Sequence, residues 1–321
     1  MIGLELVYRI AGVLVAAVAI ANLRDRTNPK RWRNAVFWGA YGASLLFGSY
    51  LPDFVNGCLV IALVLVAGLG GLGRGDPAAS KSTSHEERAA SAARWKNRLF
   101  VPALLVPTCT LAATLGLRHL PAGVSGLVDP KNVSLVALAL SAMFALGVAM
   151  IFFRPPLAAP LRESRRLMDL IGWAAVLPQM LAALGALFAA AGVGDRVAEL
   201  LGRFVPLDSP LAVVTAYTIG MALFTVVMGN AFAAFPVMTA AVGLPIIVGK
   251  LGGDPAVMAA LGMLSGFCGT LMTPMAANFN VVPAALLELP DKNGVIRAQV
   301  PTALLLLFGN TILMYLLVFR R

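Results

Sequence analysis

The sequence is poor in charged side chains. Only 12% of its 321 residues are Asp, Glu, Lys or Arg, whereas 59% are hydrophobic. An ordinary soluble domain has about 25% charged residues, because polar side chains must cover its water-facing surface. This scarcity of charge argues against a soluble enzyme and against a disordered chain. An integral membrane protein is the class that fits.

Cysteine and histidine are equally scarce. Cys58, Cys109 and Cys268 lie far apart, and His85 and His119 fall in polar segments. This spacing contains no CxxC pair and no cluster of metal ligands, so we expect no disulfide and no zinc, haem or iron–sulfur site. The sequence also lacks an HExxH motif, a P-loop and a Ser-His-Asp set. We therefore expect no enzymatic activity and no cofactor.

Long apolar runs take the place of the missing charge. A helix that crosses about 30 Å of hydrocarbon needs about 20 mainly apolar residues, and no run alternates as a strand would. The predicted spans are 4–23, 34–51, 54–72, 99–117, 132–153, 167–192 and 299–319, and two longer segments cover 210–250 and 255–288. We predict an all-α integral membrane protein with about eight transmembrane helices, one re-entrant hairpin (210–250) and one broken helix (255–288).

Basic residues alternate between the loops. Loops 24–33, 73–98 and 154–166 are rich in Arg and Lys, and the loops between them are poor in both. The positive-inside rule places the basic loops in the cytoplasm and the N-terminus outside. The predicted organisation is a set of N-terminal spans (1–72), a polar cytoplasmic loop ending in a short amphipathic helix (73–98), scaffold spans (99–208) and a transport unit (209–321).

The two longer segments do not read as plain spans. As continuous helices they would extend about 60 Å and about 51 Å, and each contains helix-breaking residues near its centre. The first has Gly229, Asn230 and Pro236, and the second has Gly269 and Pro274. The first segment fits either two short full spans or a re-entrant hairpin with its tip near mid-membrane. Alternatively, glycine and proline serve only close packing and kinks.

Broken helices expose main-chain dipoles inside the membrane. Free N–H groups at a half-helix end suit a carboxylate, and free carbonyls suit Na⁺. Asn and Thr side chains beside the breaks add ligands without permanent charge. The candidate substrate- and ion-binding residues are Gly229, Asn230, Ala231, Gly269, Thr270, Thr273, Pro274 and Asn278, among which Asn230, Thr270 and Asn278 are the predicted Na⁺ ligands.

Two further polar residues lie in predicted spans. Asp169 follows Arg162, Arg165 and Arg166 closely in sequence, so we expect an interfacial ion pair, with a proton-relay carboxylate as the alternative. Asn310 follows a glycine inside the last predicted span, where we expect a hydrogen bond between helices.

Two sequence stretches carry a resemblance to a transporter superfamily. GNAFAAFPVMTAAVGLP (229–245) resembles the hairpin-tip segment of the ion transporter superfamily, which includes the divalent anion/sodium symporters. SGFCGTLMTPMAAN (265–278) resembles its unwound partner helix. The tip triad there is Ser-Asn-Thr; here it is Gly229-Asn230-Ala231. The resemblance covers about 209–319 and implies one ion-transporter-type repeat.

Most of the chain also resembles an uncharacterised bacterial membrane family, domain of unknown function 979. GFCGTLMTPMAANFN (266–280) and the run from VPAALLEL to QVPTALLL (282–306) carry this likeness. The resemblance implies a permease subunit of the bacterial cytoplasmic (inner) membrane, encoded beside a second, smaller membrane protein and near a pyroglutamyl peptidase. It thereby points to 5-oxoproline or a similar small acid.

These observations lead to a functional hypothesis. Superfamily transporters carry two inverted repeats, and this sequence shows one broken pair, so we expect a second copy of the chain or a second small membrane subunit to complete the site. We predict a secondary-active permease, or permease subunit, for a small organic anion coupled to Na⁺ or H⁺. The alternatives are an ion/proton antiporter and a non-transporting membrane scaffold.

Overall fold

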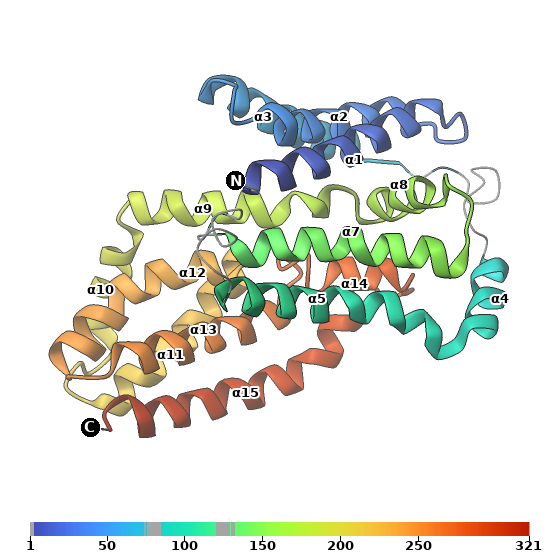
Figure 1. The fold of residues 1–321 in the computed structure, drawn as a ribbon. Coiled ribbons are helices and arrows are strands. Elements are labelled where there is room, and N and C mark those ends of the chain that lie inside the picture. Colours follow the sequence, from blue (N-terminus) through green and yellow to red (C-terminus); the bar gives the residue numbers. More distant parts are fainter. Residues whose placement is uncertain (1–2, 74, 76–84, 120–128, 130–131, 321) are drawn as a thin grey trace. The chain divides into compact units, whose positions relative to one another are not determined.

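The chain folds into helices throughout the residues that the structure describes. The computed structural model describes residues 3–73, 75, 85–119, 129 and 132–320 (Figure 1). Within these ranges there is no strand, and seven helices are long and apolar enough to cross a membrane. The protein is therefore a multi-pass membrane protein, as predicted. It divides into two units, Met1–Asp169 and Leu170–Arg321.

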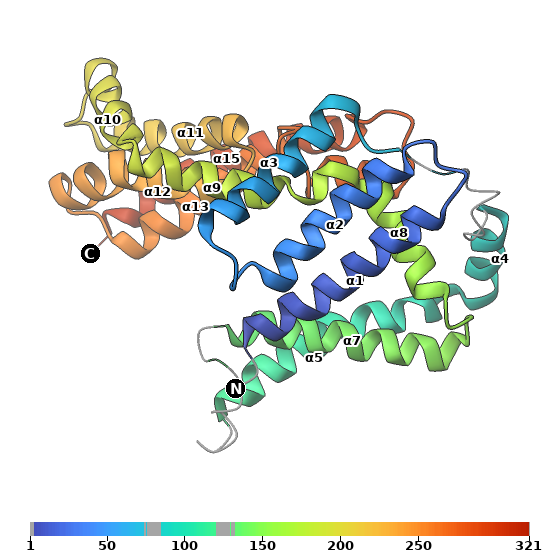
Figure 2. The ribbon, with the colours of Figure 1, turned by 90° about the horizontal axis from the view of Figure 1, so that it is seen from above.

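The first unit is built from helices that pack in pairs. The elements are α1 (Leu4–Arg24), α2 (Arg31–Phe47), α3 (Asp53–Gly70), α4 (His85–Trp95), η1 (Lys96–Leu99), α5 (Phe100–His119), α7 (Val133–Phe153) and α8 (Ala159–Ile171), which ends just past the division. Helices α1 and α2 lie side by side (Figure 2), as do α5 and α7. A Cβ at Gly42 would lie 3.1 Å from the backbone nitrogen of Ala16, so small residues set the approach of α1 and α2.

Helix α4 confirms the short helix predicted at the end of the polar loop. It leads into α5, and its last residue, Trp95, packs against Phe152 and Phe153 at the end of α7, with ring centroids 5.5 and 5.1 Å apart. The most polar stretch of the predicted loop, residues 76–84, lies outside the described residues.

The second unit is a helical bundle with an apolar core. Its elements are η2 (Gly172–Ala175), α9 (Leu177–Ala190), α10 (Val193–Phe204), α11 (Pro210–Met228), α12 (Ala231–Met238), the π-helix η3 (Thr239–Lys250), α13 (Pro255–Leu271), α14 (Val281–Leu286) and α15 (Gly294–Val318). Helix α11 packs against α12 and α13, and α13 packs against α15 (Figure 1). Tyr217, Met221 and Ile247 are fully buried between them.

Local signals in the sequence fix where the bundle helices begin. Ser209 and Asp254 cap α11 and α13 with their side-chain oxygens, and each is followed by proline at the first helical position. The backbone N–H of Asp254 donates to the carbonyl of Val318 over 2.7 Å. Lys250 and Asp208 form an ion pair of 2.8 Å. The starts of α11 and α13 therefore lie at the same end of the bundle as the ends of η3 and α15.

Several predicted spans differ from the helices observed. Span 34–51 is the 17-residue α2, which begins at Arg31 and ends at Phe47. Span 167–192 is interrupted by the 3-10 turn η2, where Gly172 has a left-handed φ of +61°. In addition to the seven long helices, two shorter apolar ones run over Asp53–Leu69 and Pro255–Leu271.

The segment 210–250 breaks where the sequence predicted, but its two arms are long. Pro210–Met228 has 19 residues and Ala231–Lys250 has 20, and both meet the length and hydropathy of a membrane span. At 1.5 Å per residue each arm reaches about 30 Å, enough to cross the hydrocarbon core. Helix length thus favours two full crossings over a short re-entrant hairpin. The break at residues 229–230 then lies where the end of the first crossing meets the start of the second.

Candidate functional site

The first break lies between α11 and α12. Helix α11 ends at Met228, and the next residue, Gly229, has a φ of +70°, the left-handed conformation that glycine adopts without strain. Asn230 then starts α12, and its Oδ1 accepts the backbone N–H of Phe232 over 2.9 Å. The Gly-Asn pair therefore both stops one helix and caps the next, and this explains why the chain breaks here.

The second break follows α13, where residues 272–280 form turns. The side chain of Asn280, fully buried, donates from Nδ2 to the carbonyls of Thr270 (2.8 Å) and Thr273 (2.7 Å). The carbonyl of Thr270 is one that the end of α13 leaves without a helical partner, and the carbonyl of Thr273 also accepts the backbone N–H of Ala276 over 3.3 Å. The Oδ1 of Asn280 is buried and accepts no hydrogen bond from a described residue. Asn280 therefore supports the unwound segment from inside.

The two breaks touch each other. The hydroxyl of Thr273 donates to the carbonyl of Val226 in the last turn of α11, over 2.9 Å. A Cβ added at Gly229 would lie 2.7 Å from backbone and side-chain atoms of Met275. The end of α11 and the turn after α13 are thus packed backbone to backbone, and only glycine fits at position 229.

Close packing explains two of the predicted site residues. A Cβ at Gly269 would overlap the carbonyl oxygen of Ala222, so this glycine allows α13 to approach α11. Ala231 is 1% exposed, and its Cβ would lie 3.0 Å from one added at Gly266. At Gly269 the close approach is of the kind that the alternative explanation, close helix packing, expects.

A cavity of about 240 Å³ lies beside the two breaks. Phe232, Phe267 and Phe279 contribute apolar walls, and the rings of Phe232 and Phe267 meet edge to face with centroids 5.8 Å apart. Three polar side chains also line the cavity, those of Asn230, Thr270 and Asn278. A small number of polar groups in an apolar cavity is typical of small-molecule sites.

The polar side chains of this cavity are neutral, and two of them have amide groups that make no hydrogen bond to a described residue. Asn230 uses Oδ1 as a helix cap, but its Nδ2 makes no hydrogen bond to a described residue. The side chain of Asn278 is exposed, and its amide also makes no hydrogen bond within the described ranges. The hydroxyl of Thr270 donates to the carbonyl of Phe267 over 2.6 Å and keeps its lone pairs. The cavity thus offers amide donors and hydroxyl or amide oxygens, without a charged side chain among its lining residues.

The predicted site residues separate into two groups. The cavity is lined by Gly229, Asn230, Thr270 and Asn278, whereas Ala231, Gly269, Thr273 and Pro274 do not line it. Asn280 is not among the predicted site residues, although it supports the second break. Its place in the sequence could have indicated this role, because Asn280 lies in the same non-helical stretch as Thr273 and Asn278.

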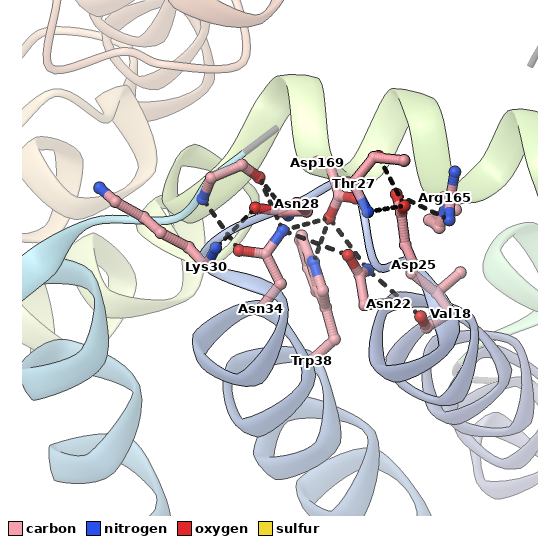
Figure 3. A network of polar contacts seen from close by, with 11 residues as sticks. Val18, Asn22, Asp25, Thr27, Asn28, Lys30, Asn34, Trp38, Arg165 and Asp169 are labelled. Atoms are coloured by element: carbon pink, nitrogen blue, oxygen red, sulfur yellow. Dashed lines mark hydrogen bonds and ion pairs between the residues drawn. The ribbon is translucent and has the colours of Figure 1, made fainter. Parts of the chain in front are cut away.

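A second polar cluster lies in the first unit, around Asp169 near the end of α8 (Figure 3). Its Oδ1 accepts hydrogen bonds from Nδ2 of Asn22 (3.1 Å), Nδ2 of Asn34 (3.0 Å) and Nε1 of Trp38 (3.0 Å). The expected ion pair with a neighbouring arginine is wrong, because Arg165 binds a different acid. The three donors are buried residues of α1 and α2 that the sequence analysis had not selected.

The Asn310 prediction is confirmed, because its amide on α15 donates to the sulfur of Cys268 on α13 over 3.7 Å.

Comparison with known proteins identifies the family. Residues 5–319 match the family described as "Protein of unknown function (DUF979)", so the chain belongs to this family over nearly its whole length. No curated protein and no solved structure matches the chain.

Proposed function

We propose that this DUF979 protein is a secondary-active permease, or a permease subunit, for a small organic anion. The observation that carries the proposal is the contact of two helix breaks around a cavity with two uncommitted amides, Asn230 and Asn278. Broken helices that meet in a membrane protein are the arrangement that transporters use to bind solutes. The protein has no enzymatic activity in this proposal.

The chemistry of the cavity favours a small carboxylate. The Nδ2 groups of Asn230 and Asn278 are donors, and α12 directs the positive end of its dipole toward the cavity lining at Asn230. The volume of about 240 Å³ is below the range of about 300–1,000 Å³ typical of drug-sized ligands. A compact acid such as 5-oxoproline, which also carries an amide, suits both the size and the donors.

The coupling ion in this proposal is Na⁺ or H⁺. Oxygens of Thr270, Asn278 and Asn230 would provide neutral ligands for Na⁺, and the cavity lining has no carboxylate. We further propose that the protein resides in the bacterial cytoplasmic membrane with its N-terminus outside. A second copy of the chain, or a second small membrane subunit, would complete the transport site.

Uptake into proteoliposomes tests the proposal. The full chain is reconstituted with and without the companion membrane protein, and the entry of labelled 5-oxoproline is followed under a sodium or a proton gradient. Asn230→Asp is the informative variant, because an aspartate keeps the oxygen that caps α12 but replaces the Nδ2 donor with a negative charge. We expect uptake to fall by about tenfold or more, since a hydrogen bond to a charged group is lost.

Asn293→Asp is the matched control. Asn293 is an exposed residue that precedes α15 in the same unit and makes no side-chain cap, so the same chemical change there leaves uptake intact. Undiminished uptake by Asn230→Asp overturns the site. Ion flux that needs no organic anion supports the antiporter instead. Absence of uptake in a well-assembled complex with the companion supports the scaffold.

A further inference from the structure

The two arginines nearest to Asp169 in sequence are paired with other acids. Arg165, one turn earlier on α8, acts on Asp169 electrostatically, but its guanidinium forms an ion pair of 3.1 Å with the buried Asp25. Arg166 pairs with Glu163 over 2.7 Å. No residue of the described ranges forms a salt bridge with Asp169. The remaining charged residues on α1, α2, the loop between them and α8 are Glu5, Arg9, Arg24, Arg26, Lys30, Arg31, Arg33 and Arg162.

The orientation of the amides around Asp169 is fixed by the backbone. The N–H of Gly73 donates to Oδ1 of Asn34 (2.9 Å), and the carbonyl of Gly73 accepts from Nδ2 of Asn34 (2.8 Å). This two-point contact directs Nδ2 of Asn34 toward Asp169. The same Nδ2 donates to Oδ1 of Asn22, so Asn22 must also present its Nδ2 to the carboxylate. Gly73 is required here, because an added Cβ would lie 2.6 Å from Oδ1 of Asn28.

This arrangement selects the ligand that the site can accept. Metal cations need several oxygen atoms directed at one point. Here the converging groups are N–H donors, and the indole N–H of Trp38 has no acceptor alternative. All three hydrogen bonds end on Oδ1, and Oδ2 takes none from the described residues. A proton on Oδ2 is the cation that fits, because the neutral acid keeps Oδ1 as an acceptor.

We propose that Asp169 is a proton-binding site. The Oδ2 atom takes a proton from water, forming an O–H bond and the neutral acid, and returns it to water on release. Asp169 is only partly buried. The proposal concerns the first unit alone and does not rest on the proposed transport function.

Protonation of Asp169 also changes the strength of the hydrogen bonds between α8 and helices α1 and α2. Hydrogen bonds to an ionised carboxylate are roughly twice as strong as those to a neutral carbonyl oxygen. Loading the proton therefore weakens the three bonds from Asn22, Asn34 and Trp38, which join α8 to α1 and α2 (Figure 3). Proton occupancy and the packing of these helices are thus linked.

Infrared difference spectroscopy of the full-length protein in lipid tests the proposal. The spectrum is recorded from about pH 9 down to about pH 3, a range that spans ordinary carboxyl and histidine titration. We expect a carbonyl band of a protonated carboxylic acid that is lost in Asp169→Asn. The asparagine keeps an oxygen for the three donors, so we expect it to fold. Glu163→Gln, which removes a carboxylate six residues earlier on α8, leaves the band in place.

Trp38→Phe provides a second measurement that does not depend on the folding of Asp169→Asn. It removes one donor to the ionised form, so the midpoint of the band should move to higher pH by about one unit. The proposal is overturned if the band is the same in Trp38→Phe, in Asp169→Asn and in the unaltered protein. It is also overturned if no carboxylic acid band titrates. A midpoint that falls when Na⁺ is added identifies a metal-cation site instead and also overturns it.

Discussion

The hydroxyl of Thr273 donates to the carbonyl of Val226 across 2.9 Å, and this bond joins the turn after α13 to the last turn of α11. Thr273 is 2% exposed, and its oxygen also accepts the backbone N–H of Met275 over 3.2 Å. One side chain thus connects the two helix breaks that define the candidate site. Through these two bonds Thr273 positions the turn after α13 against α11.

Thr273→Val removes these two bonds at nearly constant volume. The carbonyl of Val226 and the N–H of Met275 lose their partner, so we expect a loss of about 1–3 kcal/mol in the free energy of unfolding. Thr273→Ser keeps the hydroxyl and should retain most of the stability. Thermal unfolding in detergent measures the difference. Equal melting temperatures for the two variants would contradict the assigned role.

Gly269→Ala tests the close approach of α11 and α13. The new methyl group would overlap the carbonyl oxygen of Ala222, and overpacking of this kind costs about 1–3 kcal/mol. Gly309→Ala in α15 is the control, because an added Cβ there meets no atom within 4 Å. In a helix interior that change should stabilise the protein by about 0.5–1 kcal/mol. Opposite shifts in melting temperature are expected, and a tolerated Gly269→Ala would disprove the contact.

Asn280 and Asn278 make a matched pair for the second break. Asn280→Leu removes the donor to the carbonyl of Thr270 and one of the two donors to the carbonyl of Thr273, so we expect a loss of about 1–3 kcal/mol. Asn278→Leu changes an exposed side chain with no hydrogen bond to a described residue, and stability should stay within about 0.5 kcal/mol. Uptake should nevertheless fall in Asn278→Leu. Unfolding and uptake measured on the same samples separate support from binding.

The ion pair between Lys250 and Asp208 predicts a weak pH dependence. The hydrogen bond from Lys250, and then its charge, hold the pKa of the Asp208 carboxyl below its ordinary value. A lowered folded-state pKa contributes stability above the unfolded value of about 3.9, and that stability is lost as the pH falls through the folded value. Both side chains are exposed, so the effect should be small and disappear in high salt. Thermal unfolding of Asp208→Asn at low salt should lack this acid-side loss.

Asp169→Asn also bears on transport. If the bound proton is the coupling ion, the variant has a permanently neutral side chain, and uptake should lose its response to a proton gradient. Exchange of labelled for unlabelled 5-oxoproline across the membrane needs no net proton movement and should survive. Proton-driven uptake that is unchanged in Asp169→Asn would exclude this residue from coupling, while leaving its proton binding to be judged by the infrared measurement.

The sequence by itself determined the membrane class and the places where the chain leaves a helix. Hydropathy counts apolar residues, and the membrane demands a fixed length of them, so α1, α7 and α15 fall within a few residues of the predicted spans except at the start of α15. Gly229 and Asn230 act on their own backbone, and a conformational preference of that kind is readable locally.

Tertiary structure decided which polar groups meet. Asp169 has three arginines close by in sequence, yet its partners come from residues 22, 34 and 38, more than 130 positions away. Asn280 and Gly269 owe their roles to a neighbouring turn and a neighbouring helix. A hydrogen bond or a close approach depends on which surfaces pack together, and spacing along one helix does not contain that information.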